Sequence, residues 1–426
     1  MKTIFANKLK NRIKAAMARS PRLYHAMKGL RERYKQILVH TPKSCLIVKP
    51  TNSVLNLEEC RRLPLVLKSK PPLVYAEICT YCNLNCRMCG RAVHGMKKED
   101  QGFMKREIFD KLTELFTPGG TLALFGRGET LLHPEFIYFL KSAKDRGMKV
   151  SFNSNGKALN KEIALAMVKY MQDSITFSCS AGTAKTYEAI HRGGKWDHLW
   201  SNIAMLNEAK KLHGFGVRGA PVIYLEFVSQ MDNIKELPLL VQRALEWELN
   251  GLLVIDVVAH SPELEKQRMN IPENIPTAEE YYTQAISIRD KLKKLNPNFD
   301  LRLPSVYNPL TKKFMDKSEV KTFRELNLKL EQKPGCGQDN KMCIEPWQTF
   351  YARFDGMVAP CVITNRNLGD LNTQSAMEIW NGQEFQKFRS RMRSENKPFE
   401  CLRCHLFPGP QRYDNALDNA EEYEAL

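Results

Sequence analysis

The sequence predicts an α/β fold in which six parallel strands and their helices form a partial (β/α)6 barrel. Between residues 73 and 260, short apolar, β-branched segments bounded by Gly, Asn and Ser alternate with longer segments of helical periodicity. This alternation is typical of a parallel sheet covered by helices. Eight strands would close a complete barrel, so six predict an open one. The predicted strands cover residues 73–80, 121–129, 149–156, 174–180, 222–230 and 251–260.

The segments between the predicted strands have the apolar spacing of helices. Because the loops after the C-terminal ends of barrel strands converge, we expect the active site at that end. After residue 260 the alternation stops. Residues 261–335 are rich in Pro, Asn and Lys, and they are predicted to form a linker or insertion over the barrel mouth, with a helix at 278–295. The predicted barrel helices cover residues 105–116, 134–146, 160–171, 199–212 and 234–248.

Residues 1–72 lie before the barrel and are predicted to be a basic, amphipathic helical extension. Within it, residues 1–36 contain eleven Lys or Arg and one acid, Glu32, so eleven minus one gives a net charge of about +10, more than half of the total of +17. Such a helix binds an anionic membrane surface or an acidic partner; a solvated leader is the alternative. No aromatic and basic groove is evident, so no nucleic acid partner is expected. The apolar residues at helical spacing are Ile4, Phe5, Leu9, Ile13 and Met17.

The sequence contains no run of 18 uncharged apolar residues, and its first residues lack the pattern of a secretory signal. We therefore expect a cytoplasmic protein, with peripheral attachment at the inner membrane face through residues 1–36 as the open alternative.

In a reducing compartment, twelve cysteines indicate metal or redox chemistry rather than disulfides. Five cysteines that stand apart from the others are predicted to be small buried hydrophobes: Cys45, Cys60, Cys79, Cys179 and Cys336.

Three cysteines lie together in "YCNLNCRMCG" (81–90), directly after the first predicted strand, with the spacing C-x3-C-x2-C. They are Cys82, Cys86 and Cys89. A structural zinc ion needs four ligands, and His94 or Asp100 are the nearby residues that could complete such a site. A [4Fe–4S] cluster tolerates one iron without a protein ligand when a small molecule binds there. The spacing therefore favours a cluster with an open iron, with zinc as the alternative.

This loop, in this position, resembles the signature of the radical S-adenosylmethionine (SAM) superfamily, whose core is a partial TIM-type barrel. The resemblance implies that SAM binds the open iron, and that a reductant such as flavodoxin or ferredoxin supplies an electron. The residue before the third cysteine is commonly aromatic in the family. Here it is Met88, which is apolar and polarizable enough to pack against an adenine.

Three later stretches resemble SAM-binding segments of the same family. "FGRGETLLHPEF" (125–136) resembles its glycine–glutamate–proline loop, although Thr130 replaces the usual proline. "NSNG" (153–156) resembles the Ser/Thr-Asn-Gly that ends the third strand. "SCSAGTAKTYEAIHRGG" (178–194) resembles a further segment, with Ser180 where many relatives have aspartate. The resemblance implies that SAM is contacted by Met88, Gly128, Glu129, Ser154 and Arg192. Of these, Arg192 is expected to grip the SAM carboxylate through its fork of donors.

A second group of cysteines lies in residues 336–410, a block too short to fold around an apolar core of its own. The block resembles the SPASM/twitch extension of radical SAM enzymes, and its spacing is closest to the shorter twitch type. The resemblance implies one auxiliary [4Fe–4S] cluster with four cysteine ligands, Cys343, Cys361, Cys401 and Cys404. Cys336 is an alternative ligand, and a zinc site of the same cysteines is the alternative to a cluster. Residues 411–426 are predicted to be a tail.

The resemblance implies a radical SAM oxidoreductase, in which a 5′-deoxyadenosyl radical takes hydrogen from a C–H bond of the substrate. We expect the substrate to be a hydroxylated small molecule such as a sugar or cyclitol, with the auxiliary cluster as an acceptor of the substrate electron. The alternative is a peptide or protein maturase, although residues 1–72 are too short and too basic for the usual peptide-recognition domain. An iron–sulfur scaffold without turnover is the third hypothesis. No catalytic acid, base or hydrogen donor is identified.

Overall fold

The computed structural model describes residues 51–170, 172–216, 219–304, 307–308, 313–314, 343–364 and 366–402. The described residues from Asn52 onward belong to one compact unit. The predicted basic helix of residues 1–36, the predicted ligand Cys404 and the alternative ligand Cys336 lie outside the described residues. None of the described helices is long and apolar enough to cross a membrane.

The described strands form a ten-stranded sheet in the order β12-β11-β10-β1-β2-β3-β4-β5-β6-β7, and a separate two-stranded sheet, β8-β9. Strands β1 to β7 pair in parallel, each with the next strand along the chain. The strands are β1 (Leu73–Ala76), β2 (Thr121–Leu124), β3 (Lys149–Ser154), β4 (Ser174–Ser178), β5 (Val222–Ser229), β6 (Gly251–Asp256), β7 (Asp300–Arg302), β8 (Tyr307–Asn308), β9 (Lys313–Phe314), β10 (Thr349–Ala352), β11 (Met357–Ala359) and β12 (Gly369–Asp370).

The predicted partial barrel is confirmed, because the six predicted strands are present as β1 to β6 and pair in chain order. The sheet also continues beyond them at both ends. β7 extends it past β6, and β10 lies parallel to β1 with Tyr75 opposite Tyr351. These additional strands are three and four residues long and lie outside residues 73–260, where the sequence alternates between strand and helix patterns. The C-terminal block therefore contributes strands to the barrel sheet.

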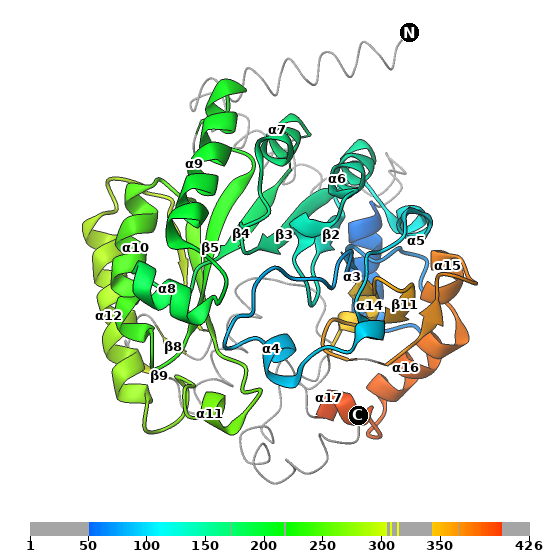
Figure 1. Cartoon of the computed structure of the whole chain (residues 1–426). Helices are drawn as coiled ribbons and strands as arrows, with labels where there is room; N and C mark the ends of the chain where they lie inside the picture. Colours follow the sequence, from blue (N-terminus) through cyan, green and yellow to red (C-terminus); the bar gives the residue numbers. More distant parts are fainter. Residues whose placement is uncertain are drawn as a thin grey trace, which may run out of the picture. The chain divides into compact units, whose positions relative to one another are not determined.

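Helices lie on the outer side of the curved sheet, with α6, α7, α9 and α10 beside the strands that they follow or connect (Figure 1). The helices are α3 (Asn52–Arg62), α4 (Gly90–His94), α5 (Arg106–Leu112), α6 (Phe136–Asp145), α7 (Lys161–Lys169), α8 (Ala184–Ile190), α9 (Trp196–Leu212), α10 (Leu237–Glu246), α11 (Pro262–Glu265), α12 (Ile275–Lys291), α14 (Glu345–Gln348), α15 (Ala376–Trp380), α16 (Gln383–Arg393) and α17 (Phe399–Leu402). Four 3-10 turns are η1 (Lys98–Asp100), η2 (Thr113–Leu115), η3 (Thr130–Leu132) and η4 (Ile234–Glu236).

Buried and half-buried residues alternate along the strands, and this alternation shows which face of the sheet packs in the core. In β4 the side chains of Ile175 and Phe177 are buried, whereas their neighbours Thr176 and Ser178 are half-buried. Strands β2, β3 and β5 alternate in the same way. Because successive side chains point to opposite faces of a sheet, the buried set packs under the helices and the other set lines the inner face of the barrel.

Two local signals in the sequence correspond to observed turns and caps. A hairpin forms at Asp355-Gly356, where β10 and β11 pair in antiparallel orientation and Arg353 N–H donates to the Met357 carbonyl at 2.9 Å. Gly356 has φ +92°, a left-handed conformation that favours glycine. Helix α7 begins after Asn160, whose side chain accepts from the backbone N–H of Ile163 at 2.9 Å.

Side chains of the C-terminal block anchor it to the residues that precede the barrel. The Trp347 indole N–H donates to the Pro64 carbonyl at 2.7 Å, and the Asn56 amide donates to the Trp347 carbonyl at 2.7 Å. The fully buried Arg389 donates to the carbonyls of Leu65 and Pro346. Helix α3 thus packs with the C-terminal block in the same compact unit. The predicted domain boundaries at residues 72, 260, 335 and 410 stay predictions.

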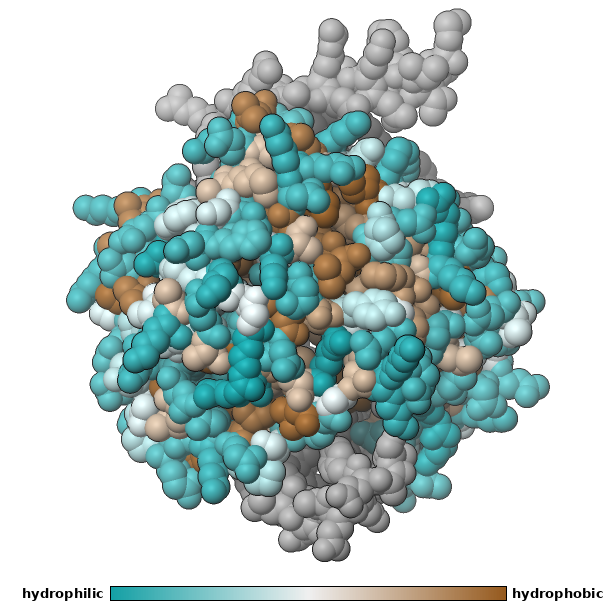
Figure 2. Space-filling view, in the orientation of Figure 1, coloured by the Kyte–Doolittle hydropathy of each residue, from teal (hydrophilic) through white to brown (hydrophobic). Residues whose placement is uncertain are grey.

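On the face shown in Figure 2, hydrophilic side chains predominate and hydrophobic ones lie between them. A surface of this composition is ordinary for a folded domain, because there is not enough polar surface to cover it completely. This face therefore gives no separate indication of a docking site.

Candidate active site

The loop with the three cysteines leaves the barrel at the C-terminal end of β1, as predicted. It is tied to the segment after β4 by two backbone hydrogen bonds. Asn85 N–H donates to the carbonyl of Arg192, and Arg87 N–H donates to the carbonyl of Ile190, both at 2.9 Å. Helix α4 follows the loop, with Cys89 as its N-cap residue. Two segments that are distant in the sequence therefore hold the cysteine loop in one place.

The three thiols are partly buried, and they lie close enough together for each to affect the pKa of another. Burial, and then the negative charges of Cys82 and Cys89, raise the pKa of Cys86 to about 12. Burial also raises the pKa of Cys82. Thiolates so placed repel one another unless a cationic group binds between them, which is what the irons of a cluster provide. The donor set therefore fits the predicted [4Fe–4S] cluster.

The alternative of a zinc site finds no support in the described residues. His94 is exposed, and its ring contacts the edge of the His260 ring with 5.4 Å between centroids. Asp100 belongs to η1. Across the described ranges, no group of three His, Cys, Asp or Glu side chains is arranged to hold a single metal ion. Three of the isolated cysteines, Cys60, Cys79 and Cys179, are buried as predicted; Cys45 and Cys336 are not described.

His191 contacts the loop and was not predicted. Its ring is buried and its Nδ1 lies 3.4 Å from the Cys86 Sγ. Burial lowers the pKa of His191 to about 4, so the ring is neutral at pH 7. Because the backbone N–H of Ser180 donates to Nε2 at 3.1 Å, the proton must lie on Nδ1, which then donates to the sulfur. A hydrogen bond of this kind orients a thiolate ligand and tunes the cluster that it holds.

Asn155 is a second side chain at the loop that sequence reasoning missed, although it lies inside the "NSNG" motif. Its amide nitrogen is 3.8 Å from the Cys82 Sγ and donates to the Asn83 Oδ1 at 2.8 Å. Asn155 directly follows β3, so the C-terminal end of β3 contacts the cysteine loop that follows β1. An Asn after a strand usually indicates a turn, so nothing in the sequence indicated separately that Asn155 contacts Cys82.

Gly128, Glu129 and Ser154 are brought together, as the motifs predict. A Cβ on Gly128 would collide with the carbonyl of Cys79 and lie 2.6 Å from the carbonyl of Tyr81. The Glu129 backbone N–H donates to that Tyr81 carbonyl at 2.7 Å. Only a glycine therefore lets the two loops approach this closely.

The Glu129 carboxylate is only 3% exposed, and burial raises its pKa. It accepts hydrogen bonds from Ser154 Oγ at 2.7 Å, from the backbone of Asn155 at 2.7 Å and from the backbone of Leu131 at 3.1 Å. These donors come from the protein itself, so the carboxylate shapes the loop. The predicted contacts of Gly128, Glu129 and Ser154 with SAM stay predictions.

Glu77 and Arg127 form an ion pair that sequence reasoning also missed. The Glu77 side chain is fully buried, and it accepts from the backbone N–H, Nε and Nη2 of Arg127 at 2.8, 3.0 and 3.1 Å. Glu77 N–H in turn donates to the Ala352 carbonyl in β10 at 2.9 Å. The pair thus joins the loop of Gly128 to both β1 and the C-terminal block. A signal existed, because Glu77 interrupts an otherwise apolar strand sequence.

The predicted contacts of Met88 and Arg192 with SAM stay predictions. Met88 is half-buried between the second and third cysteines. The Arg192 side chain is exposed and makes no hydrogen bond or ion pair with other described residues, while its carbonyl accepts from Asn85. A free guanidinium beside the cysteine loop is consistent with a role in binding the SAM carboxylate.

We expect Arg192→Ala to weaken SAM binding about 10- to 150-fold, because a bidentate, charge-assisted contact contributes roughly 1.5–3 kcal/mol. Arg192→Lys should restore only part of the affinity, since an ammonium cannot reproduce the fork of donors. The measurement is the SAM dissociation constant of the reconstituted proteins under anaerobic conditions. Lys211→Ala removes another exposed cation, from α9, and serves as the control. Equal affinity in all four proteins would assign Arg192 a purely structural role.

The second cysteine group converges although its members are far apart in the sequence. Cys343 precedes α14, Cys361 follows β11 and Cys401 lies in α17. Burial, followed by the negative charges of Glu345, Cys361 and Cys401, raises the pKa of Cys343 to about 12. The three thiols therefore lie within electrostatic range of one another, in one region of the C-terminal block. That Cys343, Cys361, Cys401 and Cys404 bind one cluster stays a prediction, and Cys404 lies outside the described residues.

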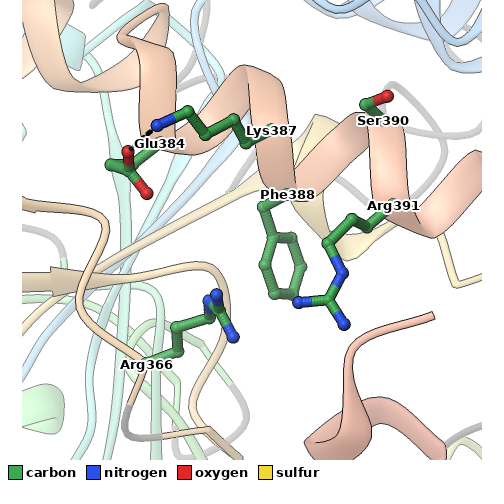
Figure 3. A pocket seen from close by; sticks show the side chains of 6 residues that line it. All are labelled: Arg366, Glu384, Lys387, Phe388, Ser390 and Arg391. Atoms are coloured by element: carbon green, nitrogen blue, oxygen red, sulfur yellow. Dashed lines mark hydrogen bonds and ion pairs between the residues drawn. The ribbon is translucent and has the colours of Figure 1, made fainter. Parts of the chain in front are cut away.

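A cavity of about 350 Å³ lies between Arg366 and residues of α16 (Figure 3). Lys387 donates to Glu384 at 2.7 Å, and Arg366 pairs with Glu400, the neighbour of Cys401, at 3.2 Å. The cavity is lined by Arg366, Glu384, Lys387, Phe388, Ser390 and Arg391. Its charged side chains already have partners within the protein, and none of the cysteines lines it. We therefore place the active site in the barrel instead.

An open parallel barrel with a three-cysteine loop at its C-terminal strand ends, and a second cysteine group after it, defines a class of iron–sulfur enzymes. Sequence models of two families match the chain accordingly. That of the radical SAM superfamily matches residues 77–234, and that of the SPASM iron–sulfur cluster-binding domain matches residues 343–405. The protein is a radical SAM enzyme with a SPASM domain, and it uses SAM and [4Fe–4S] clusters. The predictions of family, enzyme class and cofactors are thereby confirmed.

One relative is similar in sequence along most of the chain. It is the tungsten-containing aldehyde ferredoxin oxidoreductase cofactor-modifying protein of Pyrococcus furiosus, 23% identical over 360 residues, which cover 78% of this chain and 87% of that protein. Two solved structures share the fold. SuiB of Streptococcus suis bound to its precursor peptide SuiA has a TM-score of 0.56 at 13% identity, covering 89% of this chain and 81% of that one. For anSMEcpe with bound AdoMet the TM-score is 0.50 at 16% identity, covering 79% and 86%.

Proposed function

We propose that the protein oxidises a hydroxylated small molecule, such as a sugar or cyclitol, by abstraction of hydrogen from one of its C–H bonds. The observation that carries this proposal is the polar inner face of the barrel. The half-buried residues of β3, β4 and β5 that face inward include hydroxyl, amide and carboxylate side chains. They are Ser151, Asn153, Thr176, Ser178 and Glu226. A polyol would find donors and acceptors there, whereas an apolar ligand would leave them unpaired.

The relative from Pyrococcus furiosus supports a small-molecule substrate, because its name describes the modification of a cofactor. In contrast, SuiB was solved with a precursor peptide. Peptide maturation, by crosslinking or epimerisation, is therefore the second candidate function. The two candidates make opposite predictions about which class of compound loses hydrogen to the SAM-derived radical.

When bound, SAM and its cluster supply a 5′-deoxyadenosyl radical that abstracts hydrogen from the substrate. The protein holds this machinery with Cys82, Cys86 and Cys89, and His191 and Asn155 orient two of the three sulfurs. Inner-face residues orient the substrate. We further propose that Cys343, Cys361, Cys401 and Cys404 hold one auxiliary [4Fe–4S] cluster that accepts an electron from the substrate.

Two partners complete the proposal. A flavodoxin or ferredoxin is the proposed reductant of the first cluster. Residues 1–36 are proposed to bind an anionic membrane surface or an acidic protein, since they carry a net charge of about +10.

The test uses anaerobically reconstituted, dithionite-reduced protein with perdeuterated probes. Deuterated glucose and myo-inositol represent the first candidate, and a deuterated peptide library represents the second. We expect deuterium to appear in 5′-deoxyadenosine when a sugar or cyclitol is present, as measured by mass spectrometry. Transfer from the peptides, with none from the sugars and cyclitols, would reject the proposed function in favour of peptide maturation.

A further inference from the structure

One carboxylate on the inner face of the barrel differs from the other buried glutamates of the site. The Asn153 amide of β3 donates to the Glu226 Oε2 of β5 at 3.1 Å. Strand β4 lies between these two strands, so their backbones are roughly 9.5 Å apart. A hydrogen bond that crosses a strand requires both side chains to point to the concave face of the curved sheet. Glu226 and Asn153 therefore lie inside the barrel.

The register neighbours of Glu226 on both sides are uncharged. On β4, Ser178 is its register partner, and Thr176 is the partner of Asn153. Leu253 is the register partner on β6. Within the described residues, no lysine or arginine pairs with Glu226, and Asn153 is the one side chain that donates to its carboxylate. Burial accordingly raises the pKa of Glu226.

Glu226 accepts fewer hydrogen bonds from the protein than Glu77 and Glu129 do. Each of those carboxylates accepts three hydrogen bonds from protein donors. An ionised carboxylate has about four acceptor positions, and Glu226 uses one of them for Asn153. The remaining acceptor positions of this half-buried carboxylate need donors from water or from a ligand. The inner face thus presents an acceptor that the protein itself leaves available.

The pair is also close to the place where the reaction begins. Asn153 and Asn155 are two residues apart along one chain segment, and Asn155 contacts the Cys82 sulfur. At about 3.3 Å per residue, this spacing places Asn153 roughly 7 Å from the residue that contacts the first cysteine. A small ligand bound between Glu226 and the cysteine loop would span this distance.

We propose that Glu226, oriented by Asn153, binds a hydroxyl group of the substrate on the inner face of the barrel. This inference rests on the proposed function and identifies the group through which the substrate is recognised. The Asn153 amide fixes the rotation of the carboxylate, and the remaining acceptor positions take hydrogen bonds from one hydroxyl or from two adjacent ones. An unpaired carboxylate would then reject analogues that lack the hydroxyl.

The test is Glu226→Gln, which keeps the shape of the side chain and an oxygen for Asn153 but replaces an acceptor by an amide. With perdeuterated myo-inositol as the probe, we expect the deuterated fraction of 5′-deoxyadenosine to fall at least tenfold. Asn153→Ala should lower it less, because the carboxylate remains but loses its orientation. Glu246→Gln, on the exposed side of α10, is the matched control and should keep the wild-type fraction. Circular dichroism and iron content verify that each variant is folded and loaded.

Three outcomes would overturn the inference and are distinguishable. If wild-type protein transfers deuterium and Glu226→Gln transfers an equal fraction, the proposed function stands and the inference fails. If wild-type protein transfers no deuterium from either deuterated myo-inositol or deuterated glucose, the proposed function fails and the inference fails with it. If Glu226→Gln raises the SAM dissociation constant at least tenfold without changing the deuterated fraction, the carboxylate binds the SAM ribose instead of the substrate.

Discussion

The triple variant Cys82→Ala, Cys86→Ala and Cys89→Ala is expected to release no 5′-deoxyadenosine from SAM in the presence of dithionite. All three thiols at the end of β1 are lost, so no cluster with an open iron can assemble there. The Cys343 group lies in another part of the chain and should keep its iron. We therefore expect the iron content to fall from about eight to about four per chain, as two four-iron clusters become one.

The measurement combines iron and sulfide analysis with chromatography of the SAM cleavage products. Cys60→Ala, in α3 and outside both cysteine groups, is the control and should retain the wild-type iron content. Continued cleavage of SAM by the triple variant would show that these cysteines do not hold the catalytic cluster. Stoichiometric zinc in the wild-type protein would contradict the cluster assignment itself.

Gly128→Ala is expected to have the second largest effect, a loss of SAM affinity of about 10- to 100-fold. The added methyl group would collide with backbone atoms of residues 79–81, which cannot rotate away as a side chain can. Overpacking of this kind costs typically 1–3 kcal/mol. The loops must separate, which would break the hydrogen bond from Glu129 N–H to the Tyr81 carbonyl and shift the cysteine loop.

Equilibrium binding of SAM to the reconstituted protein measures this effect. Gly216→Ala is the matched control, because nothing lies within 4 Å of a Cβ at that exposed position. The control should bind SAM like the wild-type protein. If Gly128→Ala also binds normally, the close approach of the two loops is not required for the SAM site.

Much of the fold could be predicted because its signals are local. The strands β1 to β6 are short apolar segments separated by helical periodicity, and such patterns depend only on neighbouring residues. The cysteine loop, "GRGE" and "NSNG" follow successive strands, and parallel strands bring their C-terminal ends together. The sequence therefore predicted that Gly128, Glu129 and Ser154 would meet near the cysteines, and they do. The sheet extensions β7 and β10 were missed because they lie outside residues 73–260, where strands and helices alternate in the sequence.

The sequence by itself determined the barrel, the positions of the two cysteine groups and hence the family and cofactors of this protein. Only the tertiary structure decided which side chains serve those sites. His191 meets Cys86 across 105 positions in the chain, Glu77 meets Arg127 across 50, and Glu226 meets Asn153 across 73. Each contact depends on the curvature of the sheet and on which face a side chain occupies. Long-range proximity of this kind leaves no periodic trace in a single sequence, because it arises from packing rather than from the conformation of neighbouring residues.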